Sequence, residues 1–230
     1  MKLFISLACL LLTSSLYGVD AASILQKADE IRNPTGTFRM EVTVDNSDGS
    51  HNRFEINIGG KNKSLIKTLK PRRDVGKNFL MIDENMWAFV PNINRSLRVS
   101  LNQKISGQAS NGDISRMRWH GDYSAILEGE NKKSWQLLLT ASKKGLTYDK
   151  IRVWVAKKSF RPIKADLMTK NGRKIKDIVF KKFKKIAGGT RPVKMIITDA
   201  TDSSKSTVLR IKKMTELKIP DSFFVTENLK

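Results

Sequence analysis

The chain has very few residues that could build disulfides or zinc sites: one cysteine and two histidines among 230 residues. A disulfide framework needs paired cysteines, and a structural zinc site needs several thiolate or imidazole ligands, so both are excluded. Aromatic residues make up only 7%, and 22 acidic residues face 43 lysines and arginines. The net charge of +21 implies anionic partners such as nucleic acid, lipid headgroups or a membrane surface.

No apolar run is long enough to span a membrane, which takes about 20 residues. The longest run, Leu3 to Leu12, follows Lys2 and precedes a stretch of small residues. This layout is typical of a secretory signal peptide, which we assign to residues 1–21. Three cleavage positions fit: after Gly18, Ala21 or Ala22, with the Val19-Asp20-Ala21 ending favoured.

Cys9 lies inside the apolar run, whereas a lipidated cysteine would close it, so we expect no lipid anchor. Cleavage would also remove this sole thiol. We expect residues 22–230 to form one exported, soluble domain, because a single core suits a chain of this length.

Hydrophobic periodicity indicates a helix followed by many strands. Apolar residues at helical spacing predict a helix between residues 22 and 32: Ile24, Leu25, Ala28 and Ile31. The Asn-Pro-Thr-Gly sequence at 33–36 ends it. The period then changes to two, which predicts a hairpin with a turn at 46–49.

Further short alternating segments recur about every ten residues and predict strands at 65–69, 79–82, 86–90, 97–101, 135–141, 150–156, 162–168, 175–183, 193–198 and 206–211. Alternation is lost at 102–130, where we expect a long loop with short helices at Ile114 to Trp119 and Tyr123 to Leu127. The predicted fold is mainly β: a single curled antiparallel sheet of about eleven strands. It forms an open half-barrel over the N-terminal helix and the helical or loop plug.

Residues for catalysis are scarce, and we expect no enzyme, metal or cofactor. Neither Gly59-Gly60 nor Gly188-Gly189 leads into a phosphate-binding motif. His51 lies in a predicted turn, and His120 with Asp122 lies in a basic loop where a solvated imidazole is the simpler interpretation. The adjacent carboxylates at 83–84, 128 and 130 lie in turns with no sign of the burial that raises a pKa.

Lysine pairs and clusters are spread along the chain, most densely at 181–185. The simpler interpretation is that these lysines lie at solvated strand ends. The alternative is that their charge steers the protein towards anionic lipid headgroups. Nucleic-acid binding would require exposed aromatics interleaved with the basic residues, and most aromatics fall at inward strand positions, so we expect no nucleic acid.

Several segments, taken in order, resemble the LolA-like outer-membrane lipoprotein-sorting proteins: residues 28–31, 71–80, 86–91, 95–100, 153–155, 160–164 and 219–229. The resemblance covers nearly the whole mature chain. It implies an incomplete barrel over helices, an apolar cavity for acyl chains, and a periplasmic carrier of a lipid or lipoprotein. The segment 105–122 departs from the family pattern, which leaves the lid and the cargo open.

Strand parity, combined with this resemblance, gives the candidate site. The expected cavity residues are Met40, Val42, Val44, Phe54, Ile56, Ile58, Phe79, Met81, Trp87, Phe89, Val153 and Val155. Arg95 and Arg98 are expected at the mouth or headgroup position, and Trp119 and Tyr123 in the lid. Ordinary core packing is the competing interpretation for each apolar residue.

The resemblance also implies partners: an inner-membrane transporter as donor and an outer-membrane acceptor, with the protein acting as a monomer. Two other functions stay open. One is a non-carrier envelope binding module that serves as an accessory subunit of a lipid-exporting membrane transporter. The other is a polyanion binder that uses the net positive charge.

Overall fold

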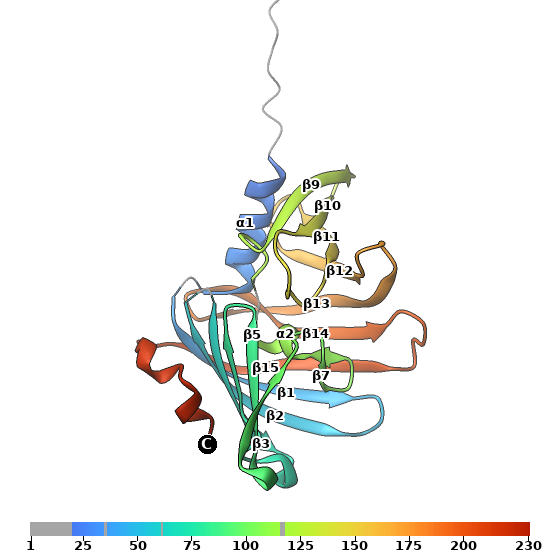
Figure 1. The fold of residues 1–230 in the computed structure, drawn as a ribbon. Coiled ribbons are helices and arrows are strands. Elements are labelled where there is room, and N and C mark those ends of the chain that lie inside the picture. Colours follow the sequence, from blue (N-terminus) through green and yellow to red (C-terminus); the bar gives the residue numbers. More distant parts are fainter. Residues whose placement is uncertain (1–19, 35, 61, 116–117) are drawn as a thin grey trace, which may run out of the picture.

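The computed structural model describes residues 20–230 except residues 35, 61, 116 and 117 (Figure 1). Its main feature is one 13-stranded antiparallel sheet with the strand order β6-β5-β4-β3-β2-β1-β15-β14-β13-β12-β11-β10-β9. Neighbours in the sequence pair throughout, except at the centre of the sheet, where β1 pairs with β15. The sheet curls without closing, so β6 and β9 are its two edges.

The helical elements are α1 (Ala21–Arg32), α2 (Asn111–Ser115) and the 3-10 turns η1 (Arg72–Asp74), η2 (Pro91–Ile93), η3 (Asp221–Phe223) and η4 (Thr226–Leu229). The first strands are β1 (Phe38–Asn46), β2 (His51–Gly59), β3 (Lys63–Lys70), β4 (Phe79–Ile82), β5 (Asn85–Val90), β6 (Arg95–Val99), β7 (Lys104–Ser106) and β8 (Ala109–Ser110). The others are β9 (Tyr123–Glu130), β10 (Ser134–Ala141), β11 (Lys150–Ala156), β12 (Pro162–Met168), β13 (Lys174–Ile186), β14 (Gly189–Asp199) and β15 (Ser206–Glu216).

The predicted half-barrel is confirmed, but the strand count of about eleven is too low. Residues 123–130 form edge strand β9 and not the predicted helix, because they pair with β10 over their whole length. Ile126 and Leu127 are 60% and 45% exposed there, so the sequence lacks the alternation that marks a half-buried strand. The other predicted helix, 114–119, is present in part: α2 spans Asn111–Ser115, Arg118 and Trp119 are not helical, and residues 116 and 117 lie outside the described part.

Helix α1 begins where its sequence supplies a cap. The Asp20 carboxylate accepts the backbone N–H of Ser23 at 3.2 Å, which satisfies one of the free donors of the first turn. Ile24, Leu25 and Ala28 are buried as the helical spacing predicts. The helix lies against β9 and β14, while α2 lies within the curve of the sheet (Figure 1). The signal-peptide prediction concerns residues 1–21, of which 1–19 lie outside the described part.

The two faces of the sheet bury two separate hydrophobic clusters. The inner face holds the main core, to which α1, α2 and most strands contribute. On the opposite face of β3 to β5, the C-terminal segment buries Leu65, Leu80 and Phe89 beneath Phe224 and Leu229. This segment runs along the outside of the sheet (Figure 1). Within the described part, no helix has both the length and the apolar character needed to cross a bilayer.

Candidate functional site

An opening with an apolar floor lies between α1 and the sheet, and we call it the α1 pocket. Its volume is about 370 Å³, within the range of roughly 300–1,000 Å³ that is common for ligand sites. It is lined by Gln26, Asp29, Glu30, Asn33, Pro34, Phe38, Ile58, Gly60, Lys63, Met81, Ser115, Arg118 and His120. The pocket is open to solvent at the sheet rim where β1 begins and β2 ends.

Strand pairing forms the apolar floor of the pocket. Phe38, the first residue of β1, lies directly opposite Ile58 near the end of β2. Met81 of β4 extends the floor, and its partner on β3 is the buried Ser64. All three floor residues have exposed fractions of 8% or less, so little of their apolar surface is open to solvent.

A buried carboxylate connects α1 to the segment that follows α2. Asp29 Oδ2 accepts the backbone N–H groups of Trp119 at 2.6 Å and His120 at 2.7 Å. The other oxygen, Oδ1, accepts a hydrogen bond from Arg32 Nη1 at 2.8 Å. Burial raises the pKa of Asp29, although Arg32 and the two N–H groups oppose that rise. Asp29 is therefore both a wall of the pocket and the link between its two sides.

The partner of that carboxylate is buried as well. Arg32 is 6% exposed, and its guanidinium carbon lies 3.5 Å from the centre of the Trp119 ring. Phe180 of β13 meets Trp119 edge-on, with 6.0 Å between the ring centroids. Desolvation lowers the pKa of Arg32, and the Asp29 carboxylate opposes this. Charge and aromatic stacking together hold residues 118–120 over the inner core.

Two buried guanidinium nitrogens lack partners among the described residues: Arg32 Nε and Arg118 Nε. Arg118 lines the α1 pocket, and its Nη2 donates to the fully buried Asp122 at 2.8 Å. Lys63 adds a second cation to the pocket wall, and its Nζ also contacts Asp221 at 3.0 Å. The pocket thus combines an apolar floor with cationic donors, one of which has an unused N–H.

The interior beyond the pocket is nearly filled. One void of about 40 Å³ lies between Arg118, Trp119 and Tyr123 on one side and the sheet on the other. Another of about 10 Å³ lies against Met40, Val42 and Ile56. These voids are far smaller than a ligand pocket, so side chains occupy most of the space beneath the curved sheet.

A second buried polar cluster fixes α2 to the sheet. Lys176 of β13 donates to the Gln108 carbonyl at 2.8 Å, to Ser110 Oγ at 2.6 Å and to the Asp113 carboxylate at 3.0 Å. The Tyr148 hydroxyl donates to both oxygens of Asp113, at 2.8 and 3.0 Å. Burial and the nearby carboxylate hold the pKa of Tyr148 well above its usual range, so the hydroxyl stays a donor.

The predicted cavity residues divide into three groups. Ile58 and Met81 line the α1 pocket. Buried positions in the packed inner core are taken by Met40, Val42, Val44, Phe54, Ile56, Phe79, Val153 and Val155. For Trp87 and Phe89 the predicted face is wrong: both lie on the outer face beneath the C-terminal segment, and Met86 and Ala88 point inward instead.

The predicted mouth and lid also need correction. Arg95 and Arg98 lie on the exposed edge strand β6, and neither is among the residues that line the pocket. Lys63 and Arg118 are the cations found there. Trp119 and Tyr123 do lie in the segment expected to cover the core, but they are buried, at 6% and 8% exposure, and they face the 40 Å³ void.

Sequence reasoning missed Asp29 and Arg32, although their positions carried a signal. Asp29 follows Leu25 by four residues and Arg32 follows Ala28 by four, so both fall on the buried face of α1. A charged pair on an apolar helix face predicts a buried polar contact. Its partners, the N–H groups of residues 119 and 120, depend on tertiary structure and carry no such signal.

Within the described residues, no three side chains of the histidine, cysteine, aspartate or glutamate type come close enough to hold a metal ion. His120 lies at the pocket wall and is exposed. The features of the pocket that could recognise a ligand are therefore its shape, its apolar floor and its charged side chains.

Comparison with known proteins places the chain among proteins of one fold. A solved structure of a LolA superfamily protein, NE2245 from Nitrosomonas europaea, is 33% identical with a TM-score of 0.85 and covers 92% of this chain and 100% of its own. A domain from Vibrio parahaemolyticus described as outer membrane lipoprotein-sorting is 20% identical with a TM-score of 0.74, and covers 91% and 97%. A DUF1329 family protein from Desulfovibrio piger is 22% identical with a TM-score of 0.75, and covers 91% and 97%.

A family model that carries only the description "uncharacterized protein" matches residues 60–230. Comparison with curated protein sequences finds no match. The two solved structures below 25% identity support the fold alone, whereas the first shares both fold and sequence over its full length.

Proposed function

The chain belongs to the LolA superfamily, and from this premise we propose that it is a periplasmic carrier that binds acyl chains of a lipid or lipoprotein in the α1 pocket. The observation that carries the proposal is the pocket of about 370 Å³ with the floor of Phe38, Ile58 and Met81, at one rim of a half-barrel whose interior voids are small. Burial of each methylene contributes about 0.8 kcal/mol, so even a partly inserted chain gains several kcal/mol.

The chemistry of the wall supports an amphiphile over a purely apolar ligand. Arg118 and Lys63 lie beside the apolar floor, and Arg118 Nε is a buried donor without a partner in the described residues. A phosphate or carboxylate at the head of an acyl chain would accept from such donors. Asp29 and Glu30 on α1 lie in the same wall, so the anionic head would bind on the side of the pocket away from the helix.

Insertion of a longer chain would require α1 and residues 118–120 to separate. The interior voids of about 40 and 10 Å³ do not hold an acyl chain. Arg118 lines both the α1 pocket and the larger void, so the two spaces share a wall. The Asp29 hydrogen bonds to Trp119 and His120 cross this boundary, and we propose that they break when cargo enters.

The signal peptide assigned to residues 1–21 and the family membership support export to the periplasm. Carriage between an inner-membrane donor and an outer-membrane acceptor would follow from that location. We propose these partners by class only.

One observation favours a second candidate. Because the inner core is filled, the fold could serve as a binding module for a membrane transporter without carrying lipid itself. Under that function the pocket would be dispensable for activity.

A fluorescent fatty acid distinguishes the two candidates. Gln26 is an exposed pocket residue on α1, so Gln26→Trp would obstruct the pocket without disturbing the core. Ser23→Trp is the matched control, because Ser23 is exposed on the same helix, is not a lining residue and lies after all three expected cleavage positions. The carrier proposal expects saturable binding that Gln26→Trp weakens at least about tenfold and Ser23→Trp leaves unchanged. Absence of binding, or equal effects of the two variants, would refute it.

A further inference from the structure

The two rims of the half-barrel differ in charge. The rim where β13 and β15 end carries six exposed lysines, which we call the lysine rim: Lys181, Lys182, Lys184, Lys185, Lys212 and Lys213. The opposite rim is formed by the turns that begin β13 and connect β14 to β15 and β1 to β2. Cations and carboxylates balance one another there: Lys174 contacts Asp177 at 3.8 Å, and Lys205 contacts Asp202 at 3.2 Å. The other carboxylates of this rim are Asp45, Asp48 and Asp199.

Cross-strand pairing gives the lysine rim few opposite charges: of its six lysines, only Lys213 lies directly opposite a carboxylate, that of Glu41. Lys181 lies directly opposite Lys194, and Lys194 lies directly opposite Arg210. Like charges at directly opposed positions destabilise a strand pair. None of the rim lysines forms an ion pair with a described residue. Arg210, by contrast, pairs with Asp45, and Arg53 pairs with Glu41 at 2.7 Å. Towards the ends of β13 and β15, the positive charges therefore outnumber the carboxylates that could neutralise them.

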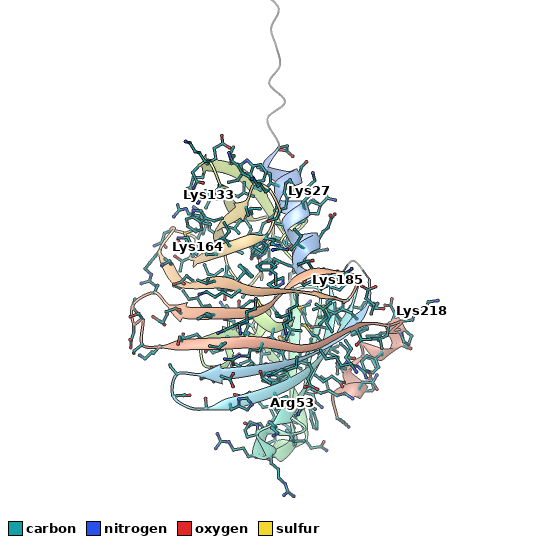
Figure 2. All side chains as sticks on the ribbon, turned by 180° about the vertical axis from the view of Figure 1, so that it is seen from behind. Lys27, Arg53, Lys133, Lys164, Lys185 and Lys218 are labelled. Carbon is teal, nitrogen blue, oxygen red and sulfur yellow. The ribbon has the colours of Figure 1, made fainter. Side chains whose placement is uncertain are left out.

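The lysine rim adjoins the opening of the α1 pocket. Phe38 of the pocket floor pairs with Glu216, the last residue of β15, so pocket and rim lie on neighbouring strands. Figure 2 shows Lys185 and Lys218 on one side of the molecule, whereas Lys133 lies at the far end of the sheet. Half-buried apolar side chains alternate with the cations here, among them Phe183, Ile186 and Leu217.

We propose that the lysine rim docks the protein on an anionic lipid bilayer, with the α1 pocket facing the membrane surface. Anionic headgroups match the six rim lysines, which lack ion-pair partners among the described residues, and the asymmetry between the rims orients the molecule as it approaches. Interleaved apolar residues suit the boundary between headgroups and acyl chains. A nucleic acid is the weaker match, because the aromatic residue of this rim, Phe183, is half-buried and Arg161 already lies over its ring, 5.0 Å from the centroid.

The inference that the protein docks on a membrane depends only on where the lysines lie. The inference that lipid passes between the membrane and the pocket also rests on the proposed function.

The test of docking is co-sedimentation with vesicles of phosphatidylcholine and phosphatidylglycerol in equal parts, and with vesicles of phosphatidylcholine alone. The rim variant carries Lys181→Gln, Lys184→Gln, Lys212→Gln and Lys213→Gln. The control removes the same charge elsewhere through Lys132→Gln, Lys133→Gln, Lys144→Gln and Lys158→Gln, all exposed and without ion pairs in the described part.

We expect the wild-type protein to bind the anionic vesicles, less at high salt, and to ignore neutral ones. Each lysine near an anionic surface contributes about fivefold in affinity, so the rim variant should bind at least about 30-fold more weakly while the control falls less than about fivefold. Failure of the wild type to bind anionic vesicles, or equal losses in both variants, would overturn docking. So would tighter binding to duplex DNA than to the vesicles, with the same dependence on the rim. Fatty-acid binding by the rim variant reports on the proposed function separately.

Discussion

Arg32 and Trp119 form a buried stack, with the guanidinium carbon 3.5 Å from the centre of the indole ring. Asp29 lies one helical turn before Arg32 and pairs with it at 2.8 Å. The stack joins the only long helix of the described chain to the segment that follows α2. A charged pair inside an apolar core adds little net stability, but the loss of one partner is costly.

Asp29→Ala should therefore destabilise the protein strongly. The change leaves the Arg32 charge buried without its carboxylate and removes the acceptor of two N–H groups. We expect the free energy of unfolding in urea to fall by about 3–5 kcal/mol. Asp29→Asn retains one acceptor oxygen and should cost less. A loss below about 1 kcal/mol for Asp29→Ala would contradict a role for this carboxylate in linking α1 to residues 119 and 120.

The pH dependence of stability should report the same group. The pKa of Asp29 is higher in the folded protein than in the unfolded chain, because burial disfavours its charged form. Between the two pKa values the folded state binds more protons, so the contribution of Asp29 to stability falls as pH rises through this window and then levels. The difference in unfolding free energy between the wild type and Asp29→Asn, measured by urea titrations across the acidic range, should show this fall. A difference that rises with pH through the same window, or that does not change, would contradict it.

Sequence patterns predicted the half-barrel because each alternation reports one strand and its inward face. The hairpin of β1 and β2 follows this rule, with Met40, Val42, Phe54 and Ile56 all buried. Alternation alone does not show which face of a strand packs against the inner core when another segment covers the opposite face. Trp87 and Phe89 alternate as an inward face would, yet they lie beneath a C-terminal segment far away in sequence.

The functional site was only partly predictable for a similar reason. Ile58 and Met81 were found by parity, but the pocket exists because α1, Ser115, Arg118 and His120 leave a gap above them. Arg118 and Lys63 enter the wall through tertiary placement. Arg95 and Arg98 have the right charge but lie on the edge strand β6.

Tyr148→Phe tests the attachment of α2 to the sheet. The variant removes the hydroxyl that donates to both oxygens of Asp113 and keeps the ring. Because Asp113 retains Lys176 as a partner, we expect a moderate loss of about 1–3 kcal/mol in the free energy of unfolding. An unchanged unfolding midpoint in thermal denaturation would show that the hydroxyl adds nothing to the cluster.

Gly59→Ala tests the contact between the sheet and the C-terminal segment. A Cβ at this position would overlap the Phe224 ring, so the ring must move and the outer cluster must repack. We expect a loss of about 1–3 kcal/mol in the free energy of unfolding. Gly129→Ala is the matched control, because a Cβ there meets nothing within 4 Å. The control should stay within about 0.5 kcal/mol of the wild type. Equal stabilities of the two variants in urea denaturation would argue against close packing of Phe224.

The central claim is that the α1 pocket holds an acyl chain, and native mass spectrometry of the protein purified from cells tests it most directly. We expect a fraction of the protein to carry an added mass that fragments as a lipid or acylated species. That mass should be lost in Gln26→Trp and retained in Ser23→Trp. A single unliganded mass for the wild type, unchanged after incubation with phospholipid, would contradict the account.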